Sequence, residues 1–343
     1  MPDKNPTLSI IMPFFNNKKL VAEMIDSIIA NSFCDWELLA IDDGSSEETL
    51  EFLCSYTADR RIRIIRRESS PKGAQTCRNI GIREMRGEFV VFFDSDDYIT
   101  PDCLQTRVDA IRENARADFM VFPSGTYVGH TFHPDAPRFI YGYNVHEDDI
   151  RSFARRELPF IVWTNIYRSA AIRKYGMTWD TNLLSLQDAD FNMTAILRGM
   201  KYGYARVRPD YGYRIAYSQE TVSKKIVSEE HFNSHIYATG KFFSQLQTVY
   251  GHKYDRAIFQ GMLSIYNQVF TNGIDKTAAR RMAGCIYKYN RRLGLIFKFE
   301  VLLTIFLEKF VSARKARQIP MTPYLLIHIR REKAIRNRIT PIE

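Results

Sequence analysis

Acidic residues stand at the ends of two short apolar segments in the first hundred residues. Several like charges at one place repel one another unless a cation lies between them. Oxygen ligands select hard cations such as Mg²⁺ or Mn²⁺, which keep the phosphates of a substrate in their coordination shell. We therefore expect a site for a divalent cation that carries phosphates. The residues concerned are Asp42, Asp43, Asp94, Ser95, Asp96 and Asp97.

A second acidic pair, Asp188 and Asp190, opens a predicted helix over 188–198 that ends before Gly199. Either carboxylate could act as a general base, and residues two apart on a helix point in different directions, so only one can face a substrate. Asp188 is also a candidate for the N-cap of this helix.

The elements that must position these residues follow from the apolar pattern. Apolar runs predict strands over 8–13, 36–41, 62–65, 89–93 and 119–122, and helical periodicity marks the segments between them. Such alternation predicts an α/β fold with a mostly parallel, doubly wound sheet, which binds ligands beyond the carboxyl ends of its strands. After residue 228 the sequence is almost wholly helical.

Five stretches resemble, in order and spacing, the motifs of family 2 glycosyltransferases, which have the GT-A fold. The resemblance covers about residues 8–220 and implies a Rossmann-like sheet flanked by helices. It also implies inverting transfer of a sugar from a nucleotide-diphosphate donor, with UDP favoured, to a saccharide or lipid-linked acceptor in capsule, O-antigen or exopolysaccharide synthesis. The stretches are Ser9–Asn16, Ile41–Ser46, Gly73–Ile82, Phe93–Asp97 and Gln187–Phe191.

The resemblance also implies roles for individual residues. Asp188 matches the general base, which favours it over Asp190, and Asp96 with Asp94 is expected to hold Mn²⁺ or Mg²⁺. Gln187 replaces the family's Glu and so removes a charge that would raise the pKa of Asp188. The residues expected to bind the nucleotide sugar are Pro13, Phe14, Asn16, Asp42, Asp43, Arg78, Asp94, Ser95 and Arg214.

Aromatic and histidine side chains give weaker signals. Trp163 and Tyr167 could stack on an acceptor sugar, but core packing explains such residues equally well. His231 and His235 lie four residues apart on a predicted helix without a third ligand nearby, and we interpret them as surface or core histidines rather than metal ligands.

Charge is unevenly distributed along the 343 residues. Residues 1–220 hold 27 Lys or Arg and 31 Asp or Glu, a net −4, whereas residues 221–343 hold 21 and 8, a net +13. We therefore predict a catalytic domain over 1–220 and a basic helical region over 221–343. The apolar run near Val301 is interrupted by charges and predicts an interfacial helix on an anionic membrane, with a structural appendage or a dimer contact as the alternatives.

Other functions are less consistent with the sequence. A sugar nucleotidyltransferase normally has a Gly-rich basic loop after its first strand, where Pro13–Asn16 stands here, and a non-catalytic sugar-binding protein would not need the acidic residues. No motif typical of nucleic-acid binding is present. The five dispersed cysteines favour a reducing cytosol, and the first residues do not resemble a signal peptide, so we expect a cytoplasmic protein on the inner face of the membrane.

Overall fold

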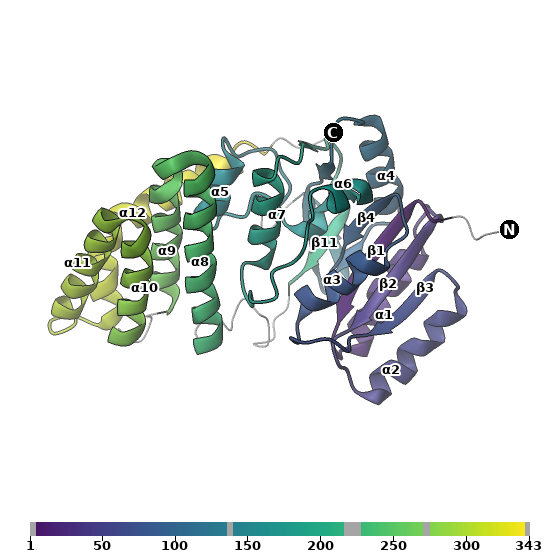
Figure 1. Cartoon of the computed structure of the whole chain (residues 1–343), viewed down its shortest axis with the longest axis horizontal. Coiled ribbons are helices and arrows are strands. Elements are labelled where there is room, and N and C mark those ends of the chain that lie inside the picture. The colour runs from purple at the N-terminus through teal and green to yellow at the C-terminus, as the bar shows by residue number, and fades with distance from the viewer. Residues whose placement is uncertain (1–4, 136–139, 216–227, 270–274, 340–343) are drawn as a thin grey trace.

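The computed structural model describes residues 5–135, 140–215, 228–269 and 275–339. An α/β part built on a twisted sheet occupies one end of the elongated molecule, and a group of long helices occupies the other (Figure 1). The predicted fold class, a mostly parallel sheet flanked by helices with a helical C-terminal region, is confirmed.

The main sheet has seven strands in the order β10-β6-β9-β4-β1-β2-β3. β1 pairs in parallel with β2 and β4, whereas β9 runs antiparallel to both of its neighbours. All residues of β1 and β2 are buried, as expected for strands covered on both faces. The bounds are β1 (Leu8–Phe14), β2 (Trp36–Asp42), β3 (Ile62–Arg66), β4 (Phe89–Phe92), β6 (Phe119–Val121), β9 (Asn165–Arg168) and β10 (Tyr202–Tyr204).

Helices from the connections cover this sheet. α3 packs on β1 and β2, and its approach depends on Gly81, because a Cβ there would come within 2.4 Å of the side chain of Ile11. α4 packs on β6 and β9. The helices of this part are α1 (Lys18–Ile29), α2 (Glu47–Cys54), α3 (Ala74–Glu84), α4 (Cys103–Glu113), α5 (Asp149–Ala154), α6 (Ser169–Lys174) and α7 (Gln187–Leu197).

A second, smaller sheet has the order β5-β11-β7-β8. It comprises β5 (Tyr98–Ile99), β7 (Ser124–Val128), β8 (Thr131–His133) and β11 (Tyr211–Arg214). The start of β11 is anchored by a buried bidentate ion pair, in which Arg107 of α4 donates to both oxygens of Asp210 at 2.7 and 2.8 Å. This sheet thus places the end of β11 beside the loop after β4.

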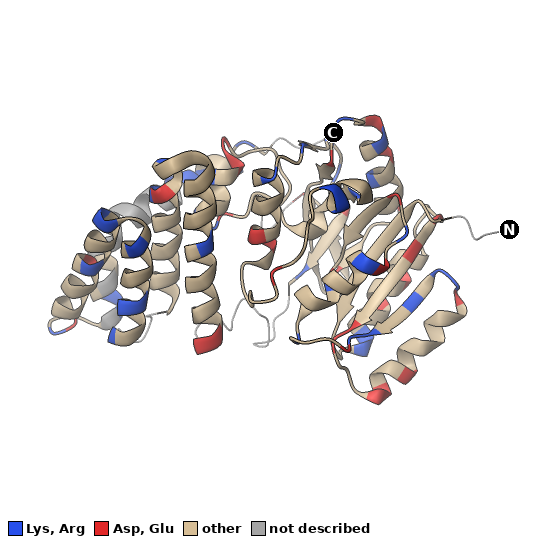
Figure 2. Cartoon of the chain, viewed as in Figure 1, with Lys and Arg blue, Asp and Glu red and all other residues tan. Residues whose placement is uncertain are grey.

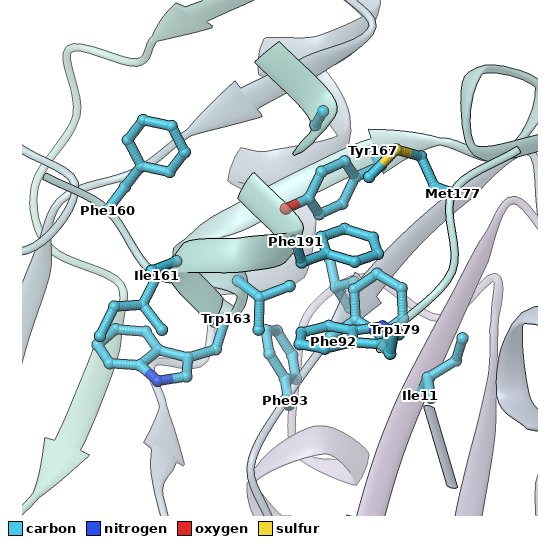
Figure 3. Packing of buried hydrophobic residues seen from close by; sticks show 14 of the residues in the cluster. Ile11, Phe92, Phe93, Phe160, Ile161, Trp163, Tyr167, Met177, Trp179 and Phe191 are labelled. Atoms are coloured by element: carbon cyan, nitrogen blue, oxygen red, sulfur yellow. The ribbon is translucent and has the colours of Figure 1, made fainter. Parts of the chain in front are cut away.

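Aromatic side chains fix α7 against the main sheet (Figure 3). Phe92 of β4 makes edge-to-face contacts with Phe191 and Trp179 at centroid distances of 5.7 and 5.6 Å, and Trp179 stacks on Phe191 at 4.4 Å. Such contacts add to the free energy of apolar burial. They bring the first turn of α7 next to the carboxyl end of β4.

The helical part consists of α8 (Glu229–Tyr250), α9 (Asp255–Val269), α10 (Lys276–Tyr289), α11 (Arg291–Leu307) and α12 (Ala313–Arg336). α8 packs on α7 as well as on α9 and α10, so the two parts of the chain are in direct contact. Lys and Arg outnumber Asp and Glu on α10 and α11 (Figure 2). Among the described helices, none has the length and apolar character needed to cross a bilayer.

Candidate active site

The carboxyl ends of β1 and β2 are bonded to each other. Asn16, in the left-handed region at φ 51°, donates its backbone N–H to Ser45 Oγ at 2.7 Å and accepts from the N–H of Ser46 at 2.9 Å. Asp42 accepts from the N–H of Ser45 at 2.8 Å. Asn16 and Asp42 therefore shape this edge, and they form hydrogen bonds within the protein rather than pointing into open space.

Asp43 lies at the same edge and is held by the guanidinium group of Arg67. Its Oδ1 accepts from Arg67 Nε at 2.6 Å and from the N–H of Gly73 at 3.0 Å. Burial and the nearby Asp43 carboxylate raise the pKa of the Cys77 thiol to about 12. Asp43 was predicted from its place after a strand, whereas Arg67 was not, because the alternation of apolar and helical segments does not mark it.

Phe15, rather than Phe14, is the aromatic residue exposed at this edge. Successive side chains of a strand point to opposite faces, and the Phe14 side chain is only 2% exposed in the core whereas that of Phe15 is 48% exposed. Lys72 Nζ lies 3.3 Å from the centroid of the Phe15 ring. Pro13 and Phe14 were expected to line the nucleotide pocket, but both are buried, so their side chains do not face a ligand in this arrangement.

Arg78 of α3 joins the end of β4 to the start of α7. It donates through Nη2 to Asp94 Oδ1 at 2.6 Å and through Nη1 to Gln187 Oε1 at 3.0 Å, and its guanidinium lies 4.5 Å from the centroid of a Trp179 ring. Its buried Nε has no hydrogen-bond partner in the described part of the chain. Gln187, which stands where the resemblance implies a Glu, thus accepts a hydrogen bond from Arg78, and the ion pair of Arg78 is with Asp94.

Two of the acids after β4 have different environments. Asp97 is buried and accepts from Tyr211 Oη at 2.8 Å and from the N–H of Arg214 at 2.7 Å, and burial raises its pKa well above the usual range. Asp96 is exposed, but the surrounding protein and then the Asp94 carboxylate raise its pKa to about 6. Asp97 is therefore a structural residue, and Asp96 points outward.

Arg214 is fixed beside these acids. Its Nε donates to the carbonyl oxygen of Asp96 at 2.6 Å and its Nη2 to Glu23 at 2.8 Å. Ser95, between Asp94 and Asp96, is partly exposed. The structure thus brings Arg214 to the loop after β4, although 117 residues separate it from Asp97.

The donor set at this edge fits a hard divalent cation. Asp94 and Asp96 offer carboxylate oxygens, and their mutual repulsion is what a cation between them would relieve. No group of three or more potential metal-ligating side chains occurs among the described residues. Phosphate oxygens of a substrate and water would therefore have to complete the coordination, as Mg²⁺ and Mn²⁺ sites commonly allow.

Asp188 and Asp190 face different neighbours. Asp188 lies in the first turn of α7, where burial is the main cause that raises its pKa to about 6; Arg78 lowers that pKa and Asp94 raises it further. Its Oδ1 is buried without a hydrogen-bond partner in the described ranges. Asp190 instead forms an ion pair with Lys241 of α8 at 2.8 Å. The N-cap of α7 is Leu186, so the N-cap interpretation of Asp188 is wrong.

Trp163 and Tyr167 lie in the core. Trp163 is 2% exposed and stacks on Tyr211 at a centroid distance of 4.5 Å, and Tyr167 is completely buried with its hydroxyl donating to Asn192 at 2.9 Å. Neither side chain can stack on an acceptor sugar in this arrangement. Burial explains both aromatic residues, and we do not propose them as acceptor residues.

The two histidines of α8 bond to neighbouring protein groups. His231 Nδ1 lies 2.8 Å from Ser185 Oγ, and His235 Nδ1 lies 2.6 Å from Arg156 Nη1. Burial, together with Arg156, lowers the pKa of His235 to about 2, so this ring is neutral. Both contacts are those of packed histidines.

The mostly parallel sheet carries acidic residues at its carboxyl edge, and Arg67, Arg78 and Arg214 are bonded to their side chains or backbone. Residues 9–176 match the model of glycosyl transferase family 2. This chain therefore carries a family 2 glycosyltransferase domain.

Relatives and solved structures agree with this assignment. The chain is 26% identical over 226 residues to poly(ribitol-phosphate) beta-N-acetylglucosaminyltransferase TarS of Staphylococcus aureus, which covers 65% of the chain and 38% of TarS. It is 26% identical over 198 residues to the uncharacterized glycosyltransferase EpsJ of Bacillus subtilis, covering 55% of the chain and 56% of EpsJ. The chain thus spans well under two thirds of the length of these relatives.

The same fold occurs in a solved structure. The crystal structure of S. aureus TarS 1-349 in complex with UDP-GlcNAc superposes with a TM-score of 0.66 at 19% sequence identity, over 91% of this chain and 88% of that one. The alignment extends beyond the family-matched residues 9–176 into the helical part. The GT-A fold with a helical C-terminal region is therefore shared.

Proposed function

We propose that the protein is an inverting glycosyltransferase that moves a sugar from a UDP-sugar to a hydroxyl group of a saccharide or lipid-linked acceptor. The observation that carries this proposal is the placement of Asp188 at the start of α7, close enough to Arg78 and Asp94 for both charges to shift its pKa. The Oδ1 atom of Asp188 has no hydrogen-bond partner in the described chain. The binding of UDP-GlcNAc and UDP by the TarS structures supports UDP as the nucleotide. Surface-polysaccharide synthesis is the proposed setting, because TarS glycosylates poly(ribitol phosphate).

The residues of the site suggest the following mechanism. Asp188 accepts the proton of the acceptor hydroxyl, and that oxygen attacks the anomeric carbon from the face opposite the nucleotide. The bond from the anomeric carbon to the diphosphate oxygen breaks, UDP leaves, and the anomeric configuration inverts. Arg78 lies beside Asp94 and would place its positive charge near the diphosphate. Asp94 and Asp96 would hold Mn²⁺ or Mg²⁺, which supplies positive charge to the departing diphosphate.

A donor screen tests this proposal directly. The full chain is incubated with single UDP-, GDP- and dTDP-sugars and released nucleotide is measured. We expect release of UDP from one or a few UDP-sugars, faster with an acceptor hydroxyl present. Formation of a nucleotide sugar from a sugar phosphate and a nucleoside triphosphate would instead indicate the nucleotidyltransferase reaction, and sugar binding without release a non-catalytic protein.

Phe15 is expected to stack on the base of the nucleotide, because it is an exposed aromatic ring at the end of β1 beside Asp43. Stacking of an aromatic side chain on a base contributes about 1 kcal/mol or more, so Phe15→Ala should weaken UDP binding by roughly fivefold or more in a calorimetric titration. Phe52→Ala is a matched control, since Phe52 is 45% exposed on α2 and also has a lysine near its ring. Equal affinities in both variants would contradict the assignment.

α11 offers a surface suited to a membrane. Four of its apolar side chains, spaced by four, three and four residues, are 54–65% exposed, and this spacing places them on one face of the helix. A groove of about 740 Å³ between α10 and α11 has apolar walls and is lined by three basic residues as well. The exposed side chains are Leu295, Phe299, Leu302 and Phe306, and the basic ones are Lys276, Arg280 and Lys298.

We therefore propose that α10 and α11 attach the protein to the cytoplasmic face of an anionic membrane. Phe299→Ser with Phe306→Ser should lower co-sedimentation with phosphatidylglycerol vesicles by ~10-fold or more, because each buried Phe contributes about 1.5–3 kcal/mol. The remaining binding should weaken with salt. Transfer to a soluble acceptor should be retained, and Phe52→Ser is the control. Unchanged sedimentation, or none by the wild type, would leave α11 as an appendage or a contact between copies.

A further inference from the structure

One face of α8 is bonded along its length to the segment that leads into α7. Residues separated by three or four positions share a face of a helix, and five such residues of α8 contact residues 180–194. Ser234 Oγ accepts from the N–H groups of Leu184 and Ser185 at 2.9 and 3.1 Å. The five residues are His231, Ser234, Tyr237, Lys241 and Gln245, and we call them the α8 stripe.

Lys241 makes the strongest contacts of the α8 stripe. Its Nζ lies 2.7 Å from Asp180 Oδ2 and 2.8 Å from Asp190 Oδ2, and both carboxylates are largely buried. Removing one partner of such a cluster leaves an uncompensated carboxylate, which is costly. Lys241 therefore connects the start of the 180–190 segment to the first turn of α7.

The α8 stripe also fixes the point at which α7 begins. Leu186, the N-cap of α7, has φ 62°, a conformation that is unfavourable for Leu and persists only where the surroundings hold it. Ser185 next to it is bonded to both Ser234 and His231. Asp188 lies two residues after this N-cap and two residues before Asp190. Its position therefore depends on the hydrogen bonds of Ser185 and on the ion pair between Lys241 and Asp190.

We propose that the α8 stripe positions Asp188, with Lys241 as the principal positioning residue. This inference rests on the proposed role of Asp188 as the base. Lys241 of α8 pairs with Asp190, whereas Asp188, two residues earlier on α7, lies near Arg78 and Asp94. A displacement of about 1 Å at a reacting group can lower the rate by ~10²-fold. The helical part of the chain is thereby a component of the catalytic site, although it lies outside the family-matched residues.

The test uses the full chain and separates positioning from stability. Lys241→Met should lower kcat by ~10-fold or more while the Kd for UDP stays within about twofold, because the nucleotide residues lie on the other side of α7. Lys241→Arg keeps a cation in reach of both carboxylates and should recover most of kcat. The same exchange at an exposed lysine of α6, Lys174→Met, should leave kcat unchanged. Ser234→Ala is a second variant that should also lower kcat, in case Lys241→Met does not fold.

The outcomes distinguish this inference from the proposed function. If Asp188→Asn is inactive and both Lys241→Met and Ser234→Ala keep wild-type kcat, the positioning proposal is overturned and the base assignment remains. A fall in thermal stability of those variants without a fall in kcat also overturns it. If Asp188→Asn is fully active, both proposals fail.

Discussion

Replacing Asp188 by asparagine is expected to lower kcat by at least ~10²-fold and to leave the Kd for UDP nearly unchanged. The amide is nearly isosteric with the carboxylate, so Arg78, Asp94 and Gln187 keep their contacts, but it cannot accept the proton of the acceptor. Steady-state kinetics with a fixed acceptor and a separate UDP titration measure the two effects independently.

Two further measurements make this prediction specific to Asp188. Because burial raises the pKa of Asp188 to about 6, the wild type should lose kcat/KM as pH falls through about 6 even at saturating Mn²⁺, which would keep Asp96 ionised, and the variant should lack this acidic limb. The raised pKa also means that ionised Asp188 destabilises the fold above about pH 6, so Asp188→Asn should not lower the Tm at pH 8.

Asp190→Asn is the matched control. It breaks the ion pair with Lys241, so we expect a lower Tm and a smaller loss of kcat, within about tenfold, with the acidic limb intact. A larger loss of kcat in Asp190→Asn than in Asp188→Asn would show that the base assignment is wrong by two residues.

Loss of the divalent cation is expected to abolish turnover. Activity should disappear in EDTA and return with Mn²⁺ or Mg²⁺. Asp96→Ala should lower kcat/KM by ~10²-fold or more, because this exposed carboxylate forms no ion pair among the described residues and is the proposed ligand of the cation. UDP affinity should be lower in Asp96→Ala than in the wild type when Mn²⁺ is present.

The comparison in EDTA completes this test. There, Asp96→Ala and the wild type should bind UDP equally, because the carboxylate acts through the cation. Asp109→Ala, an exposed acid on α4, controls for surface charge. Wild-type activity in EDTA would falsify the metal assignment.

The sheet could be predicted because its strands are encoded locally. Five predicted strands coincide with β1, β2, β3, β4 and β6 within two residues, since continuous apolar runs between helical segments have few other solutions. β9 was harder to predict, because a short antiparallel strand inside a parallel sheet has no distinct apolar pattern. Asp43, Asp94 and Asp96 were found for the same local reason, because each lies just after a strand.

Contacts between distant residues could not be predicted from one sequence. Arg78 meets Gln187 across 109 positions, and Lys241 meets Asp190 across 51, and no local pattern marks either pair. Phe15 was missed because β1 ends at Phe14, one residue later than its apolar run suggests, and the pleat then exposes the next side chain. The aromatic character of Trp163 was informative about packing and not about ligand binding.

The antiparallel strand β9 separates two stretches of the chain that have different proposed roles. Apart from Arg214, the residues proposed to hold the donor come from the chain before residue 98, whereas β9, α7 and α8 build the side on which the acceptor hydroxyl would meet Asp188. Mutations accumulating after β9 can therefore change which hydroxyl is glycosylated while the nucleotide contacts persist.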